Sequence, residues 1–124
     1  MPAPFSPDSL RANLQPLAAG QPLSSEALAY QRFYGLDFAQ RSPAVKRQLG
    51  RFNAGGYEIV SQVWWPDAPP VATLFVIHGF YAHMGLYRHV IEWGLNRGFV
   101  VIACDLPGHG LSSGERASID AFAP

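Results

Sequence analysis

The sequence predicts an α/β fold of the three-layer sandwich type, in which an antiparallel hairpin precedes a parallel β-α-β unit. Two short, continuous apolar runs, 71–77 and 99–104, are typical of strands that are covered on both faces in a parallel sheet. Apolar residues at helical spacing lie between these two runs. Further upstream, the adjacent glycines 55 and 56 separate two strand-like segments, as a hairpin turn requires.

Composition narrows the class of protein further. The 124 residues suffice for one domain or part of one, and the 48% hydrophobic content can build a core. Eight Arg and one Lys are scattered along the chain and are balanced by nine Asp and Glu. Binding to nucleic acid needs a basic surface, so we expect no nucleic-acid partner. The lone Cys104 cannot form an intrachain disulfide, and its apolar surroundings favour a small core residue over a nucleophile.

No segment of the sequence is expected to cross a membrane. Both core runs are far shorter than the roughly 20 residues that a spanning helix needs. The first residues also lack the basic start and the uninterrupted apolar stretch of a secretory signal. We therefore expect no transmembrane segment and a cytoplasmic protein.

The chain divides into three predicted parts. Residues 1–24 contain five prolines, which disfavour helix, and are predicted to form an extended leader. Residues 25–47 form a helical lead-in, in which Ser24 or Ser25 caps a helix that runs to about Leu36. Residues 48–124 are the amino-terminal part of the α/β domain.

The first half of that domain is predicted to be a β-hairpin over 48–65. In its second arm Ile59, Val63 and Trp65 share one parity, whereas Glu58 and Gln62 share the other. Such alternation is typical of an antiparallel strand with one wetter face. We therefore expect Gln62 to lie on the more hydrated side of the sheet.

The second half is the β-α-β unit. Between the two core runs, apolar residues recur at the spacing of one helix face: Tyr87, Val90, Ile91, Gly94 and Leu95. A strand, a helix and a parallel strand form a crossover connection, which is right-handed in nearly all proteins.

A glycine-bearing polar loop follows each core strand. His78-Gly79-Phe80-Tyr81 comes directly after the first strand, and the long loop 105–116 comes directly after the second. The carboxyl ends of parallel strands meet at one edge of an open α/β sheet, where such sheets bind their ligands. We therefore expect the two loops to be neighbours and to form a site.

With these motifs, residues 48–122 resemble the α/β-hydrolase family, and more narrowly its monoglyceride lipase and lysophospholipase-like branch, which is of the serine aminopeptidase type. The resemblance rests on a strand running into His78-Gly79, a helix, and a strand running into Asp105-Leu106-Pro107-Gly108-His109-Gly110-Leu111-Ser112-Ser113-Gly114-Glu115-Arg116. It implies a serine hydrolase of carboxylic esters that acts on a small acyl ester or a lipid.

The resemblance also assigns roles to the first loop. In the family, the backbone N–H of the residue after His-Gly is half of the oxyanion hole, and here that residue is Phe80. A fixed donor aimed at the developing oxyanion stabilises the transition state of acyl transfer. Gly79, Phe80 and Tyr81 are therefore expected to line the substrate site, with the Phe80 side chain free to shape an acyl pocket.

A literal G-x-S-x-G match occurs within 110–114, but we interpret its Ser112 as a loop residue. A nucleophile elbow needs a strand immediately before the serine and a helix immediately after it. Here the strand ends near Asp105, several residues too early. The acid and the histidine should also follow the serine, and no histidine follows Ser112. We expect the Asp105 carboxylate to bind loop N–H groups instead of acting in catalysis.

The sequence gives little support for a metal site or a dinucleotide-binding site. The four histidines show no metal-ligand spacing, and His78 and His109 are expected to be structural members of the loops. Glycines 108, 110 and 114 miss the dinucleotide fingerprint by one residue. We therefore expect no metal and no cofactor.

The catalytic serine, acid and histidine of the family are not expected within this chain, which stops at Pro124 in mid-element. The sequence thus predicts the amino-terminal portion of a serine hydrolase whose 124 residues are inactive alone. Two alternatives stay open. One is a dehalogenase or epoxide hydrolase on the same fold, with an aspartate as nucleophile, and the other is a non-catalytic α/β interaction module.

Overall fold

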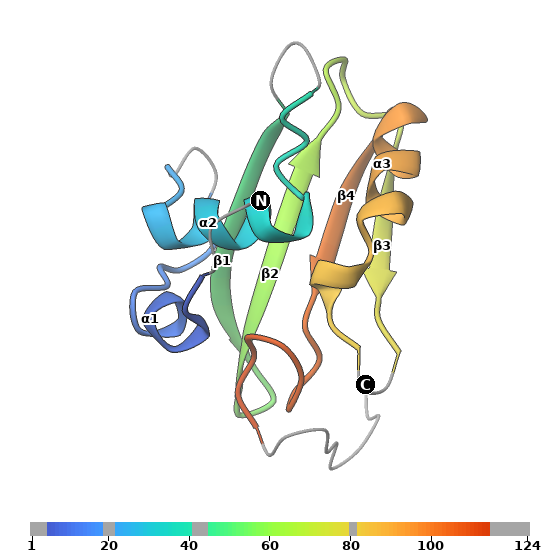
Figure 1. The fold of residues 1–124 in the computed structure, drawn as a ribbon. Coiled ribbons are helices and arrows are strands. Elements are labelled where there is room, and N and C mark those ends of the chain that lie inside the picture. The colour runs from blue at the N-terminus through green and yellow to red at the C-terminus, as the bar shows by residue number, and fades with distance from the viewer. Residues whose placement is uncertain (1–4, 19–21, 41–44, 80–81, 115–124) are drawn as a thin grey trace.

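The strands form one mixed sheet in the computed structural model, as Figure 1 shows. The structure describes residues 5–18, 22–40, 45–79 and 82–114. The strands are β1 (Lys46–Ala54), β2 (Tyr57–Trp65), β3 (Ala72–Ile77) and β4 (Phe99–Cys104), in the spatial order β1-β2-β4-β3. The β1/β2 and β2/β4 pairs are antiparallel and the β3/β4 pair is parallel. The predicted α/β class, with a hairpin before a β-α-β unit, is confirmed.

The predicted hairpin consists of β1 and β2. Its register runs from Lys46 opposite Trp65 down to a turn made by Gly55 and Gly56. These two glycines have φ values of 56° and 83°. Two successive positive φ values belong to the two-residue turn whose twist matches the flanking strands, and glycine adopts them without steric cost.

The prediction for the wetter face of β2 is wrong. Gln62 and Trp64 share a parity and both have 0% exposure, whereas Trp65 on the other parity is half-buried. The Gln62 side-chain oxygen accepts a hydrogen bond from the Gln31 amide at 2.9 Å, and the Trp64 indole N–H donates to the Leu36 carbonyl at 2.9 Å. A buried glutamine whose oxygen is bonded by a distant side chain leaves no trace in the local hydropathy pattern.

A short helix, α1 (Pro7–Ala12), lies where the sequence predicts an extended leader, so that prediction is wrong for this stretch. The Ser6 side chain accepts a hydrogen bond from the Ser9 N–H at 3.3 Å and caps the helix. Pro7 occupies the first helical turn, where its missing N–H would have had no partner. Leu10 anchors the helix with 1% exposure. The three-part division of the chain itself stays a prediction.

The second helix, α2 (Ser25–Tyr34), begins where the sequence predicts it. The Ser24 side chain accepts a hydrogen bond from the Ala27 N–H at 3.1 Å, so Ser24 is the cap. The helix ends at Gly35, which has a φ of 72°. Tyr30, on its inner face, has 2% exposure. The helix is buried through Ala27, Tyr30 and Gln31.

The β-α-β unit closes through the short 3₁₀ helix η1 (Met84–Leu86) and α3 (Arg88–Asn96). Ile91 and Leu95 of the predicted stripe are buried, with 0% and 3% exposure. Val90, also assigned to the stripe, is 46% exposed and lies at its margin. The helix therefore covers β4 and β3 with the face that the spacing predicts.

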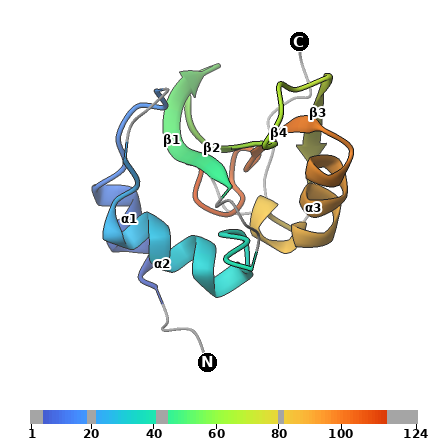
Figure 2. The same ribbon diagram turned by 90° about the horizontal axis from the view of Figure 1, so that it is seen from above.

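The helices lie on the same side of the sheet, as the view in Figure 2 shows. On the side that they cover, Val76 of β3 and Val101 of β4 have 6% and 0% exposure. On the opposite side, Phe75 and Ile77 of β3 are 64% and 63% exposed. The sequence predicts strands covered on both faces, and the described residues cover one. They therefore form two of the three layers expected.

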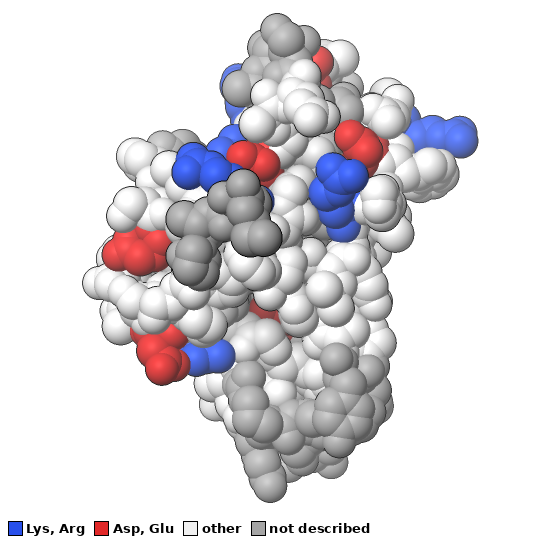
Figure 3. All heavy atoms as spheres, in the orientation of Figure 1, with Lys and Arg blue, Asp and Glu red and all other residues white. Residues whose placement is uncertain are grey.

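The helix-covered face carries charges of both signs close to one another in Figure 3. No helix among the described residues is long and apolar enough to span a membrane.

Candidate active site

The two glycine-bearing loops meet at the carboxyl edge of β3 and β4, as predicted. In the parallel register Ile77 lies opposite Cys104, so the loops leave the sheet level with each other. The Leu106 N–H donates a hydrogen bond to the Nε2 atom of His78 at 2.8 Å. The rings of His78 and His109 lie 5.0 Å apart between centroids. Both histidines are buried, in line with their predicted structural role.

Asp105 ties three segments together from the end of β4. Its Oδ1 accepts a hydrogen bond from the Met84 N–H and its Oδ2 accepts one from the Leu111 N–H, both at 2.8 Å. The residue has 0% exposure. Burial raises the pKa of the Asp105 carboxyl, and the Leu111 and Met84 N–H groups oppose that rise. The prediction that this carboxylate binds loop N–H groups is confirmed.

His83 stands beside this carboxyl at the start of η1. Its Nδ1 accepts a hydrogen bond from the Gly85 N–H at 3.1 Å, and its ring lies 5.0 Å from that of Tyr34. Burial lowers the pKa of His83, while Asp105 opposes the shift. Burial therefore favours the neutral ring, whose Nδ1 caps the short helix that carries Met84.

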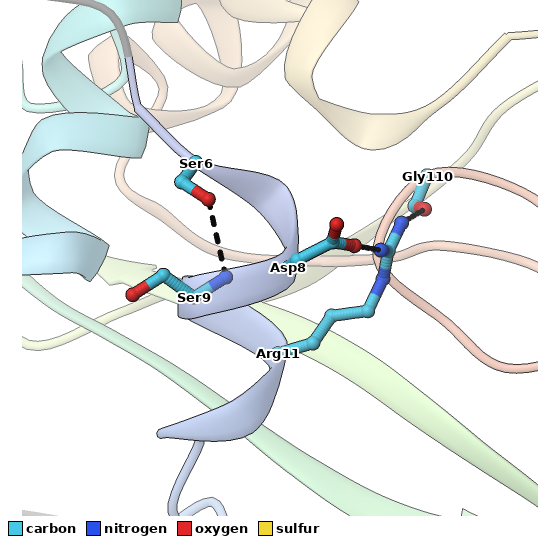
Figure 4. Close-up of polar contacts among 5 residues, drawn as sticks. All are labelled: Ser6, Asp8, Ser9, Arg11 and Gly110. Atoms are coloured by element: carbon cyan, nitrogen blue, oxygen red, sulfur yellow. Dashed lines mark hydrogen bonds and ion pairs between the residues drawn. The ribbon is translucent and has the colours of Figure 1, made fainter.

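Gly110 lets the second loop fold tightly onto Asp105. Its φ is 49°, and a Cβ built there would overlap the Asp105 carboxylate. Only glycine therefore fits both the backbone angle and the space. Figure 4 shows the other side of this residue, where the Arg11 guanidinium of α1 donates to the Gly110 carbonyl at 3.1 Å. Arg11 also pairs with Asp8 at 2.9 Å, so α1 braces the loop.

Ser112 is a buried member of the second loop, as predicted, and does not present a free hydroxyl. Its Oγ donates a hydrogen bond to the Asp105 carbonyl at 2.7 Å and accepts one from the Val60 N–H at 2.8 Å. Its exposure is 0%. A nucleophile must be able to reach the substrate, whereas this hydroxyl holds the loop against β2.

Cys104 likewise fits the structural role predicted for it. The thiol is half-buried and donates to the Ser61 Oγ at 3.4 Å. Burial raises the pKa of the Cys104 thiol, with the Ser61 hydrogen bond opposing the shift. A raised pKa lowers the fraction of reactive thiolate at neutral pH.

Of the three predicted substrate residues, the structure describes Gly79. Gly79 is exposed and lies one residue beyond His78, which directly follows β3, whereas Phe80 and Tyr81 lie outside the described residues. The predicted role of Phe80 therefore stays a prediction. Sequence reasoning missed Tyr87, whose hydroxyl accepts a hydrogen bond from the Gly79 N–H at 3.0 Å. The sequence pattern assigned Tyr87 to the apolar stripe of α3. The only sign of a second role was that its polar hydroxyl belongs to a residue at the end of α3 nearest the loop.

Within the described residues, no group of three His, Cys, Asp or Glu side chains could hold a metal ion.

The sequence of this region is similar to that of known proteins. The family model described as serine aminopeptidase, S33, matches residues 68–124. The monoacylglycerol lipase of Mycolicibacterium smegmatis is 40% identical over 65 residues, which make up 52% of this chain and 23% of that protein. Protein K6 of vaccinia virus is 39% identical over 59 residues, or 48% of this chain, and the match covers 73% of that protein.

The chain belongs to the serine aminopeptidase S33 family of α/β-hydrolases. A solved structure of a candidate lipase from Acinetobacter baumannii shares this fold, with a TM-score of 0.50 at 18% identity over 82% of this chain and 30% of the other. This S33-family chain spans about a quarter of the length of the monoacylglycerol lipase that it matches, with 23% coverage.

Proposed function

We propose that the protein is a serine hydrolase of carboxylic esters, with monoglycerides and related lipid esters as the substrate class. The observation that carries this proposal is the loop after β3, in which the exposed Gly79 stands at the sheet edge and His78 is bonded to the neighbouring loop. The match to monoacylglycerol lipase supports the choice of lipid esters.

The proposed chemistry is acyl transfer with backbone stabilisation of charge. Attack on an ester carbonyl moves negative charge onto the former carbonyl oxygen. The Phe80 N–H is proposed as one donor to that oxygen, and a donor of this kind contributes about 10²–10³ in rate. Gly79 and Tyr81 are proposed to contact the substrate beside it.

The nucleophile, acid and base are proposed to lie outside these 124 residues. Among the described serines, Ser112 matches the elbow pattern literally, but its hydroxyl already holds the loop against Asp105 and Val60. The family order of serine, acid and histidine also needs a histidine after the serine, and the sequence has none after His109.

Two substitutions of Phe80 test the proposal. They are made in the longest chain encoded by the reading frame that contains this sequence, called the full-length protein below. Phe80→Ala keeps the N–H and is expected to change chain-length preference more than kcat. Phe80→Pro removes the donor and is expected to lower kcat by about 10²–10³.

Hydrolysis is measured with short- and long-chain chromogenic esters and with a monoglyceride, and thermal unfolding confirms that both variants fold. Equal, mild losses of kcat in the two variants would show that residue 80 is not the donor. Turnover of a haloalkane or an epoxide without any turnover of esters would replace the proposed activity with an aspartate-based one.

A further inference from the structure

The backbone of Gly79 is fixed through both of its polar groups. Its N–H donates to the Tyr87 hydroxyl at 3.0 Å. Its carbonyl oxygen accepts from the Ala82 N–H at 3.0 Å and lies 2.8 Å from the Nδ1 atom of His78. Gly79 itself is exposed, so these three bonds hold a peptide segment that would otherwise be free to turn in solvent.

The hydrogen-bond network decides which nitrogen of His78 carries the proton. The Leu106 N–H can only donate, and it donates to Nε2 at 2.8 Å. Nε2 must therefore be unprotonated, and a neutral ring then carries its hydrogen on Nδ1. Nδ1 is thus the donor to the Gly79 carbonyl. The Leu106 N–H in the second loop thereby fixes the tautomer of His78 in the first loop.

The direction of the Gly79 carbonyl has a consequence for the next N–H. A trans peptide group is planar, with its C=O and its N–H pointing in opposite directions. The carbonyl of Gly79 and the N–H of Phe80 belong to one such group. A hydrogen bond that fixes the carbonyl therefore also sets the axis along which that N–H can donate.

We propose that His78 and Tyr87 are positioning residues that aim the Phe80 N–H at the oxyanion. Together with Gly79 they form what we call the Gly79 clamp. The inference rests on the proposed function, and it adds a physical reason for the donor to be aligned before the substrate arrives. Stabilisation by a preorganised donor requires no reorganisation during the reaction, and misalignment of about 1 Å can cost about 10²-fold in rate.

The clamp makes different demands on the two nitrogens of His78, and two substitutions separate them. In His78→Asn the side-chain amide can occupy the place of Nδ1 and donate to Gly79, but nothing reaches Leu106. In His78→Gln the longer side chain can present its oxygen to the Leu106 N–H, but the donor to Gly79 is lost. Both variants lose one bond of comparable strength.

The clamp predicts unequal effects on kcat in the full-length protein. His78→Gln is expected to lower kcat by about 10–100-fold with KM nearly unchanged, because the donor acts on the transition state. His78→Asn is expected to lose less than about tenfold. Tyr87→Phe removes the acceptor of the Gly79 N–H, and its loss of kcat is expected to lie between those of the two His78 variants. His89→Asn, on the exposed side of α3, is the matched control. Equal losses of kcat in the two His78 variants, or a change confined to KM, would overturn the proposal.

The tautomer is read directly by NMR of the full-length protein labelled with ¹⁵N-histidine, with the His78 variants giving the assignment. The proposal requires a protonated Nδ1 and an unprotonated Nε2 in His78 at neutral pH. The opposite tautomer with intact ester hydrolysis would reject the clamp and leave the proposed function standing. The required tautomer without any ester hydrolysis would reject the proposed function, and with it the aiming role of His78.

Discussion

At the scale of single residues, the loops are organised by a buried carboxylate. Asp105 accepts one backbone N–H with each oxygen, from Met84 and from Leu111, and so joins the segment before α3 to the loop after β4. Its own carbonyl accepts from Ser112, which extends the same connection to β2. The two loops therefore share one anchor.

Asp105→Asn is expected to destabilise the full-length protein by about 1–3 kcal/mol, because an amide has one acceptor oxygen and leaves one buried N–H without a partner. Chemical denaturation measures the free energy of unfolding. Asp67→Asn, at an exposed position, makes the same chemical change and is expected to stay within about 0.5 kcal/mol of the unsubstituted protein. Equal effects at the two positions would contradict an anchoring role for Asp105.

At the scale of elements, the sequence predicted most of what local rules control. The hairpin follows from Gly55 and Gly56, and α2 follows from the Ser24 cap. The predictions failed where tertiary contacts determine the local structure or the burial of a side chain. α1 is short and is held by Leu10 in the core, and the buried Gln62 has its side-chain oxygen bonded by Gln31 on α2. Neither partner lies near in sequence, so no local pattern indicates it.

In the candidate site, too, the features set by local rules could be predicted and those set by tertiary contacts could not. The meeting of the two loops follows from parallel strands ending at one edge, and the anchoring role of Asp105 follows from its place in a turn. The hydrogen bond from Gly79 to the Tyr87 hydroxyl and the tautomer of His78 could not be predicted. Both depend on the angle at which the loop leaves β3, which residue types and spacing do not specify.

The hairpin turn offers a test at this scale, because a Cβ at Gly55 or at Gly56 would meet no atom within 4 Å. Any effect of substitution there comes from the backbone angles alone. Gly55→Asn, which creates the Asn-Gly pair favoured in this turn, is expected to be neutral or to stabilise by up to about 1 kcal/mol. Gly56→Ala is expected to destabilise by about 1–2 kcal/mol. Chemical denaturation of both variants measures the free energy of unfolding. A destabilisation by the Gly55 substitution equal to that by the Gly56 substitution would contradict the turn type.

At the scale of the whole molecule, β3 exposes apolar side chains on the face of the sheet opposite the helices. Phe75 and Ile77 are 64% and 63% exposed on β3, which lies at the end of the strand order. A strand without a second neighbour and with exposed apolar side chains favours association with other chains.

The 124-residue chain expressed alone is therefore expected to be partly folded, to bind a hydrophobic dye and to aggregate, and to become soluble when any remainder of the full-length protein is co-expressed. Phe75→Lys is expected to reduce association of the isolated chain. Val90→Lys, at a position 46% exposed on α3, is the control on the helix-covered side and is expected to have less effect. A monodisperse monomer with a sharp, cooperative thermal transition would contradict this expectation and favour a self-contained interaction module.

Ester hydrolysis by the 124-residue chain and by the full-length protein, measured side by side, tests most directly whether these residues supply the oxyanion loop without the nucleophile. The substrates are a short-chain chromogenic ester and a monoglyceride. We predict turnover by the full-length protein and none by the 124-residue chain. Turnover by the 124-residue chain that survives repurification and disappears in Ser112→Ala would contradict the prediction, because it would make the buried loop serine the nucleophile.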